Sequence, residues 1–446
     1  MDSLLLKFIR HINTMNYHYI PLFIIINKSS KICNILKEAY KMNYLQKGTK
    51  EFTLANLALF AAGFITFANL YITQPLFPQF SEHFGVSPAI ASLSLSLSTG
   101  VLSVTLVLFG SLSEAWGRKR LMTISIFAAS ILTVLLAFAP SFEALLLLRM
   151  LQGFVFAGVP AIAMAYLGEE VDPKSLGIAM GLYISGNSIG GLSGRIIMGT
   201  MTDFFNWKIG MVFTGLLSLL ICLYFVWALP ASKHFTPRKL ELRSLSRSLF
   251  NHLKDPGLLC LFGISFTLMG GFVTLYNYIS YKLLDSPYNL SSTVVGWIFI
   301  VYLVGTFSST WFGSLSDKFG RSKVLPPGIL IMLTGALLTL PENLIIKIAG
   351  IIIFTFGFFG SHSIASGWVS YRALKDKAQA SSLYLFAYYF GSSVGGTTGG
   401  LFWAKWGWNG VIAFISAFMI TAFIFTVILV LLNRGARKPE QDINLT

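Results

Sequence analysis

Apolar stretches of about twenty residues recur along almost the whole chain, and this repetition limits what it can fold into. Hydrophobic residues make up 54% of the chain and charged residues only 11%. Soluble domains carry roughly 25% charged residues, so this composition is not typical of a water-soluble globular protein. The sequence therefore predicts an all-α polytopic membrane protein.

Twelve of these stretches are predicted to be transmembrane helices, in two sets of six. The first set lies near residues 54–76, 90–110, 121–139, 143–166, 176–200 and 207–229. The second set lies near residues 257–281, 292–313, 324–340, 344–371, 378–403 and 408–432. A basic polar linker, residues 230–256, separates the sets and predicts two six-helix bundles, residues 51–229 and 257–432. Residues 1–50 are expected to be a basic cytoplasmic extension, dispensable as far as residue 41, and residues 433–446 a cytoplasmic tail.

The positions of the 33 Lys and Arg residues predict how the helices are oriented in the bilayer. Four of them fall in predicted outer segments and two lie within spans, which leaves 27 on the inner side. Because Lys and Arg are retained on the cytoplasmic side, both termini are predicted to be cytoplasmic. The net charge of +15 then reflects topology, with the lipid bilayer as partner and no nucleic acid.

One polar motif occurs twice, after the second span of each set. It reads GSLSEAWGRKR from Gly110 to Arg120 and GSLSDKFGRSK from Gly313 to Lys323. In each copy an acid follows four residues after the first glycine, where it can meet a helix N-terminus or an arginine. The predicted cytoplasmic gate consists of Gly110, Glu114, Gly117 and Arg118 in the first copy and Gly313, Asp317, Gly320 and Arg321 in the second.

These loops resemble the signature loop of the major facilitator superfamily, G-x-L-[AS]-[DE]-x-x-G-R-[RK]. The first copy matches throughout, and the second has Ser322 at the last position. Residues 149–153, which read R-M-L-Q-G, resemble the R-x-x-Q-G motif of the same family. The resemblance implies two pseudo-symmetric bundles with a substrate site between them, exposed alternately to each side as the bundles rock.

The same resemblance implies a role for the gate residues. The acids Glu114 and Asp317 would engage helix ends of the neighbouring half while the site faces outward, and the arginines would brace them. In the first half, the expected partner of the arginine is Glu169, Glu170 or Asp172.

Matching rows of glycine mark the fifth and eleventh spans. Small residues at every fourth position let a neighbouring helix approach closely in a membrane. The rows are Gly186, Gly190 and Gly194 and, 205 residues later, Gly391, Gly395 and Gly399. The first row also resembles the antiporter motif G-x3-G-P-x2-G-G, but Gly191 stands at its Pro position and Arg195 at its last Gly. Generic helix packing and an antiporter function both remain open.

Polar and aromatic residues on otherwise apolar spans are candidates for a substrate cavity. The candidates are Asn69, Tyr71, Gln74, Gln152, Asn187, Tyr276, Asn277, His362 and Tyr388. Tyrosines near span ends can instead be interfacial anchors. The resemblance implies a coupling or charge-relay role for Arg149, with snorkelling to the outer interface as the alternative. Arg195 is assigned to the same role, with an interfacial or structural role as the alternative. Acids near the outer face could pair with them, namely Glu82, Glu143, Asp203 and Asp285.

No energy source follows from the residues themselves. The central parts of the spans carry no Asp or Glu, and His362 is the lone central residue that titrates near neutral pH. A proton gradient is therefore implied by the resemblance alone. No phosphate-binding loop, metal-ligand spacing or cysteine cluster is present, so we predict no enzyme activity, cofactor or metal site.

The sequence thus predicts a secondary active transporter that acts as a monomer in the bacterial inner membrane. Its function would be proton-coupled efflux of a small amphipathic solute, such as a drug, sugar or metabolite. An organic-anion carrier of the same fold is the alternative, because Arg149 and Arg195 lack evident central acids. A non-transporting receptor would usually carry a large soluble signalling domain, which is not apparent.

Overall fold

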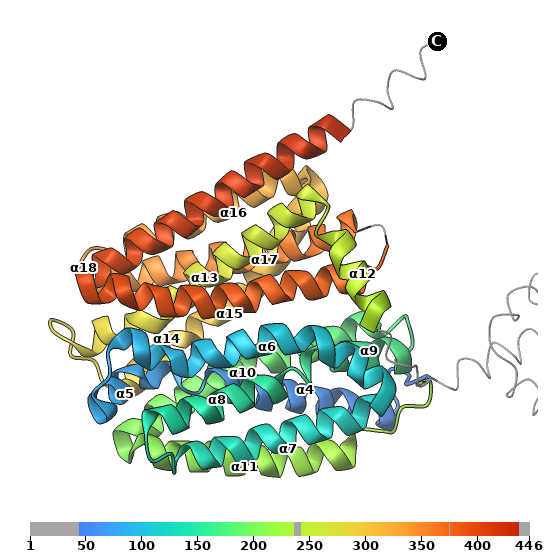
Figure 1. Cartoon of the computed structure of the whole chain (residues 1–446), viewed down its shortest axis with the longest axis horizontal. Helices are drawn as coiled ribbons and strands as arrows, with labels where there is room; N and C mark the ends of the chain where they lie inside the picture. The colour runs from blue at the N-terminus through green and yellow to red at the C-terminus, as the bar shows by residue number, and fades with distance from the viewer. Residues whose placement is uncertain (1–43, 236–241, 374, 437–446) are drawn as a thin grey trace, which may run out of the picture.

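The computed structural model describes residues 44–235, 242–373 and 375–436, and these are almost entirely helical. Two bundles lie one above the other in Figure 1, the N-terminal one below and the C-terminal one above. The first bundle contains α4 (Lys50–Tyr71), η2 (Gln74–Leu76), α5 (Phe77–Phe84), α6 (Pro88–Trp116), α7 (Arg118–Leu136), α8 (Phe142–Phe156), α9 (Pro160–Glu170), α10 (Leu176–Phe204) and α11 (Trp207–Ala228). After α12 (Leu242–His252), the second contains α13 (Pro256–Leu284), α14 (Ser292–Ile298), η3 (Phe299–Val301), α15 (Tyr302–Phe319), α16 (Arg321–Leu338), α17 (Leu344–Arg372) and α18 (Lys377–Ala436).

Ten segments of the described chain are long and apolar enough to cross a membrane. One of them is α18, which was predicted as two spans and forms one 60-residue helix broken at Gly407 (φ 56°, ψ −144°). The 29-residue helix α10 is not among the ten; it contains Arg195 and a row of glycines and serines. The total of twelve passes remains a prediction, which requires α10 to cross once and α18 twice.

The two signature motifs form the same turn in both bundles. Each motif ends one long helix and starts the next at a glycine, Gly117 with φ 93° and Gly320 with φ 88°. Residues other than glycine rarely adopt a φ in this range, so a glycine is needed at the turn. We call the end of the molecule that holds these two turns the signature end, and the opposite end, where α5 and α14 lie, the far end (Figure 1).

The glycine rows lie against the backbone of a neighbouring helix in each bundle. A methyl group at Gly190 of α10 would lie 2.2 Å from the carbonyl oxygen of Phe64 in α4. In the second bundle, a methyl group at Gly391 of α18 would lie 2.2 Å from the carbonyl oxygen of Phe266 in α13. Gly186 and Gly194 approach the backbone of α4, and Gly395 that of α13, in the same way, while Gly399 packs against the side chains of Thr274 and Tyr278 on α13. The rows therefore set how closely the first helix of each bundle packs.

Hydrogen bonds between the bundles gather from the middle of the molecule to the far end. At the far end the carboxylate of Asp203, on α10, accepts from the backbone N–H groups of Ser292 (3.1 Å) and Thr293 (2.7 Å), at the start of α14. Because a helix N-terminus leaves its first N–H groups unpaired, this acid of one bundle caps a helix of the other. Further bonds join Gln79 to Ser292, Ser81 to Tyr281, and Ser393 to the carbonyl oxygen of Ser96.

The signature end has a different pattern. Its ion pairs stay within one bundle or reach the linker, as for Arg118 with Glu169 and Arg372 with Asp255. Within the part of the chain that the structure describes, no ion pair joins the two bundles at either end. The described polar contacts between the bundles therefore lie in the middle of the molecule and at the far end, and not at the signature end.

Candidate functional site

Arg149 lies at the centre of the first bundle and is fully buried. Its guanidinium donates to the carbonyl oxygens of Ser94 (2.5 Å), Asn69 (3.1 Å) and Leu70 (2.6 Å), and to Oε1 of Gln152 (2.7 Å). Asn69 and Leu70 belong to the last turn of α4, which ends at Tyr71 inside a longer apolar span. The last carbonyls of a helix have no partner within it, and they form the negative end of its dipole. Arg149 therefore caps a helix that ends within a candidate membrane span, residues 50–84.

Two of the predicted cavity residues extend this network inside the first bundle. Gln152 donates to Oγ1 of Thr133 (2.8 Å), which donates to Oδ1 of Asn69 (2.9 Å), and Asn69 donates to Oγ of Ser218 (2.9 Å). All these side chains are buried and come from α4, α7, α8 and α11. Arg149 therefore does not snorkel to an interface. Asn69 and Gln152 face the interior of the first bundle, where their hydrogen bonds and those of Arg149 brace α4, α6, α7, α8 and α11 against one another.

Arg195 occupies a second polar site, between the bundles. Its side chain is 1% exposed, its Nε donates to Oε1 of Gln74 (2.7 Å), and its Nη1 donates to the carbonyl oxygen of Gly191 (2.6 Å). The amide of Gln74 in turn donates to Oδ1 of Asn277, in the second bundle, over 2.7 Å. The chain of three side chains therefore runs from α10 through η2 to α13.

Aromatic rings enclose the guanidinium of Arg195. Its central carbon lies 4.1 Å from the ring centroid of Tyr71, 4.7 Å from that of Phe299 and 4.9 Å from that of Tyr302. A cation over an aromatic face is stabilised by the ring quadrupole, and more so where water is excluded. Tyr71 comes from the first bundle and the other two rings from the second. The guanidinium of Arg195 is thus in contact with aromatic rings of both bundles.

The acids expected to pair with the two arginines do not do so, which corrects the sequence analysis. Among the described residues, neither arginine forms an ion pair. Asp203 caps α14, and Asp285 accepts from the N–H group of Ser286. The arginines are instead satisfied by carbonyl oxygens, amides and rings, so no carboxylate is needed within hydrogen-bond reach.

The remaining predicted cavity residues lie in an aromatic layer of the second bundle or on α10. Tyr276 is fully buried, and its hydroxyl bonds to Thr355 over 2.7 Å. His362 packs 4.8 Å from the ring of Tyr388 and accepts or donates a 3.0 Å bond between its Nδ1 and the hydroxyl of Tyr384. Asn187, on α10, packs against Gly63 of α4, within the first bundle.

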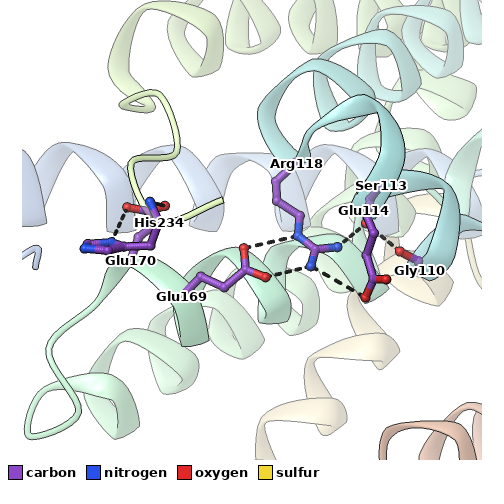
Figure 2. Close-up of polar contacts among 7 residues, drawn as sticks. All are labelled: Gly110, Ser113, Glu114, Arg118, Glu169, Glu170 and His234. Carbon is purple, nitrogen blue, oxygen red and sulfur yellow. Dashed lines mark hydrogen bonds and ion pairs between the residues drawn. The ribbon is translucent and has the colours of Figure 1, made fainter. Parts of the chain in front are cut away.

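The first signature loop forms a closed ion-pair cluster, which Figure 2 shows. Arg118 donates from Nη2 to Oε1 of Glu169 (2.6 Å) and from Nε to Oε2 (3.2 Å), a bidentate pair. Glu114 lies 4.0 Å from the same guanidinium, and Ser113 also accepts from it. Of the three acids expected to hold Arg118, the structure selects Glu169.

Neighbouring contacts attach the linker to this cluster. Glu170 is 2% exposed and binds the backbone N–H (2.9 Å) and Nδ1 (3.1 Å) of His234, as Figure 2 also shows. Among the described residues the second signature loop has no matching ion pair. Asp317 is exposed, and the guanidinium of Arg321 lies 4.6 Å from the ring centroid of Tyr371. The two copies of the motif share their turn but not their side-chain partners.

Comparison with known proteins decides the family. A model of the Major Facilitator Superfamily matches residues 59–286 and 261–444 of the chain. The chain belongs to the major facilitator superfamily. It is therefore a multi-pass membrane transporter, and its paired turns at Gly117 and Gly320 are the two signature loops of that superfamily.

Relatives cover most of this superfamily member. It is 54% identical over 381 residues to an uncharacterized MFS-type transporter, YybF, of Bacillus subtilis, covering 85% of this chain and 94% of that protein. It is 46% identical over 381 residues to the inner membrane transport protein YnfM of Escherichia coli, covering 85% and 91%. A more distant relative, 26% identical over 82% of this chain and 93% of its own, is the multi-drug resistance efflux pump PmrA of Streptococcus pneumoniae.

The superfamily fold also matches solved structures. A bacterial homolog of the human lysosomal transporter Spinster, in an inward-facing and occupied conformation, superposes with a TM-score of 0.69. The match covers 87% of this chain and 98% of that one at 16% sequence identity, and it concerns the fold alone.

Several residues of the site escaped the sequence analysis. Phe299 and Tyr302 were not selected because an aromatic residue on an apolar span looks like ordinary core. Thr133 and Ser218 were missed because small hydroxyl side chains are common within membrane helices. The predicted cavity residues Tyr71, Gln74 and Asn277 did point toward this region.

Proposed function

We propose that this transporter moves a small amphipathic solute across the bacterial inner membrane by alternating access. The supporting observation is the one-sided distribution of contacts between the bundles. Asp203, Gln79 and Ser81 bond to the second bundle at the far end, while ion pairs at the signature end stay within a bundle or reach the linker. A rocking mechanism requires such a state, with one end joined and the other free to separate.

The orientation of the two ends follows from charge. The signature turns carry two basic clusters, at residues 118–120 and 318–323, and basic loops stay in the cytoplasm. With the signature end inside, the described state faces the cytoplasm and is closed to the outside. Both termini would then be cytoplasmic. Among the described residues, Glu114 and Asp317 form no ion pair with the other half, which is consistent with a pairing that forms in the outward-facing state.

Proton-coupled efflux is our first proposal for direction and driving force. Support comes from the antiporter-like glycine row of α10 and from the efflux pump among the distant relatives. His362 is the candidate proton carrier in the middle of the spans, with its Nδ1 3.0 Å from the hydroxyl of Tyr384. If His362 carries the proton, His362→Ala abolishes the dependence of flux on a pH gradient; unchanged dependence removes His362 from this role.

An organic-anion carrier is the second candidate, favoured by one observation. Arg195 lies between the bundles, is 1% exposed and forms no ion pair within the described chain. A buried charge without a counter-ion is costly in a membrane and commonly marks a pathway for a charged solute.

Flux into proteoliposomes tests the transport function. The purified protein is assayed against a panel of radiolabelled anionic, neutral and cationic amphipathic solutes, with and without an imposed pH gradient. The test variant carries Gln79→Cys and Ser292→Cys, because the native side chains are hydrogen-bonded over 3.1 Å at the far end, and the same variant before crosslinking is its control. Joining these cysteines with a short bifunctional thiol reagent should stop flux that the unjoined double variant supports. Equal flux after complete crosslinking would contradict alternating access.

A further inference from the structure

A cavity of about 570 Å³ lies at the far end of the first bundle. Its walls come from the end of α5, the turn between α7 and α8, and the first residues of α11. Every residue that lines it belongs to the first bundle, and in Figure 1 α7 and α11 lie on the side of that bundle away from the second one. The cavity is therefore on the flank of the first bundle rather than between the bundles.

The wall of this cavity is mostly apolar and lies at the ends of two candidate membrane spans. The span 118–136 ends just before the cavity, and the span 207–228 begins beside it. Phe138 is 70% exposed and Ile209 is 46% exposed, so the protein does not cover these two wall residues. Trp207, the first residue of the second span, is of a type enriched where the hydrocarbon layer meets the headgroups. We infer that the cavity opens at that boundary.

The rim of the cavity carries two bases, Lys208 and His83, and both side chains are exposed. They flank one indole ring: Nζ of Lys208 lies 5.4 Å from the ring centroid of Trp207, and the ring centroid of His83 lies 5.6 Å from it. Among the described residues, no Asp or Glu lines the cavity and neither base forms an ion pair. The rim therefore favours a ligand with negative charge.

The size of the cavity and the contrast between its wall and its rim select one class of ligand. Cavities of about 300–1,000 Å³ are typical of sites for small molecules. A soluble anion would pair with the rim but leave the apolar wall uncovered. A neutral lipid would cover the wall but leave the lysine without a counter-ion. An anionic phospholipid satisfies both parts of the site.

We propose that this cavity binds one anionic phospholipid of the outer leaflet. Its phosphate pairs with Lys208, an ester or headgroup oxygen accepts a hydrogen bond from the ring of His83, and one acyl chain lies along Phe138, Ile209 and Val212. The leaflet follows from the proposed orientation, whereas the binding itself does not depend on the transport function. The lipid contacts α5, the α7–α8 turn and α11 at once, so it stabilises the folded first bundle.

Thermal unfolding of the purified full chain in neutral detergent micelles tests this site. Phosphatidylglycerol, added at increasing mole fraction, should raise the melting temperature at lower mole fractions than phosphatidylcholine does. Lys208→Gln, which changes an exposed side chain, should raise the mole fraction of phosphatidylglycerol at half-maximal stabilisation about fivefold, the usual contribution of one lysine near anionic lipid. Val212→Trp should weaken phosphatidylglycerol as well, because the larger side chain fills the cavity.

Lys405 provides a matched control for the charge. It is exposed and lies 4.5 Å from the ring centroid of Trp406, but it belongs to the second bundle and does not line this cavity. Lys405→Gln therefore removes the same charge beside an indole ring and should leave the effect of phosphatidylglycerol unchanged. Glycerol 3-phosphate, an anionic headgroup without acyl chains, should not raise the melting temperature.

Four results would overturn the lipid site. They are equal stabilisation of the wild type by phosphatidylcholine and phosphatidylglycerol, equal effects of Lys208→Gln and Lys405→Gln, full binding by Val212→Trp, and stabilisation by glycerol 3-phosphate as large as that by the lipid. The last result would assign the rim to a soluble anion instead. None of these measurements involves flux, so their failure would leave the proposed transport function standing.

Discussion

Arg149 and Arg195 are both buried, and neither pairs with a carboxylate of the described residues, yet their surroundings differ. Arg149 donates four hydrogen bonds, three of them to backbone carbonyls, and every partner lies in the first bundle. Arg195 donates to Gln74 and Gly191, and its charge faces rings of both bundles. The first arginine joins elements of one bundle, and the second joins elements of both bundles, which the proposed rocking would separate. The same residue type therefore braces one bundle in one place and lies at the interface between the bundles in the other.

The largest expected effect is the loss of stability when Arg149 is replaced. Arg149→Leu leaves the carbonyls of Ser94, Asn69 and Leu70 without their donor, at a cost of about 1–3 kcal/mol for each buried group. We expect little folded protein, measured as the monodisperse fraction in size-exclusion chromatography and as the melting temperature. A melting temperature equal to that of the wild type would show that Arg149 is not a brace.

The second effect concerns transport at nearly constant stability. Arg195→Gln keeps a donor for Gln74 but removes the charge from the interface. We expect a folded protein whose flux falls at least about tenfold, a loss of about 1.4 kcal/mol in the interaction with solute or between bundles. The comparison between the arginines fails if this variant loses stability as severely as Arg149→Leu.

A third prediction compares two glycines of the same helix. Gly190→Ala places a methyl group 2.2 Å from the carbonyl oxygen of Phe64, so α4 and α10 must move apart. We expect a loss of about 1–3 kcal/mol in stability, seen as a lower melting temperature. Gly181→Ala is the control, because no atom lies within 4 Å of the added methyl group. Equal melting temperatures for both variants would contradict the close packing of α10 on α4.

A smaller effect is expected at the second signature loop, where Asp317 is exposed. If Asp317 caps a helix of the other half only in the outward-facing state, Asp317→Asn disfavours that state. A carboxylate at a helix N-terminus contributes about 0.3–1 kcal/mol, so the equilibrium shifts up to about fivefold toward the described state. Labelling of Gln79→Cys from outside by an impermeant maleimide should slow accordingly. An unchanged rate of labelling would contradict this role of Asp317 in stabilising the outward-facing state.

The smallest effect is a pH dependence at the start of the second bundle. Burial raises the pKa of Asp255, but hydrogen bonds from Arg372 and from the backbone amides of Gly257 and Leu258 outweigh it, so the pKa is lowered. The pair therefore stabilises the fold above the unfolded pKa of about 3.9, and this contribution is lost as pH falls through the folded value. With solvent screening it amounts to about 1 kcal/mol or less. The melting-temperature difference between wild type and Asp255→Asn should be largest near pH 6 and narrow below about pH 4; a constant difference would exclude the charge as its cause.

More of the fold than of the candidate site could be predicted from the sequence. Glycine has few reasons to recur in a membrane helix other than close approach or a turn, so Gly117, Gly320 and the glycine rows indicated where the chain turns and packs. Gln74 and Asn277 were recognisable as polar residues on symmetry-related spans. The deep burial of Arg149 could not be predicted, because its partners include the carbonyl oxygens of Asn69 and Leu70, which are left unpaired where α4 ends at Tyr71. Backbone groups of this kind have no signal in the side-chain pattern.

Alternating access itself is tested most directly by distances across the two ends of the molecule. Spin labels on exposed residues of each bundle report the far end, at Glu82 and Asn289, and the signature end, at Arg120 and Lys318. Asp203→Ala removes both hydrogen bonds by which α10 caps α14, and thereby weakens the far-end contact. The account predicts that this variant lengthens the far-end distance and shortens the signature-end distance in the same population. A longer far-end distance with an unchanged signature-end distance would contradict the rocking of the two bundles.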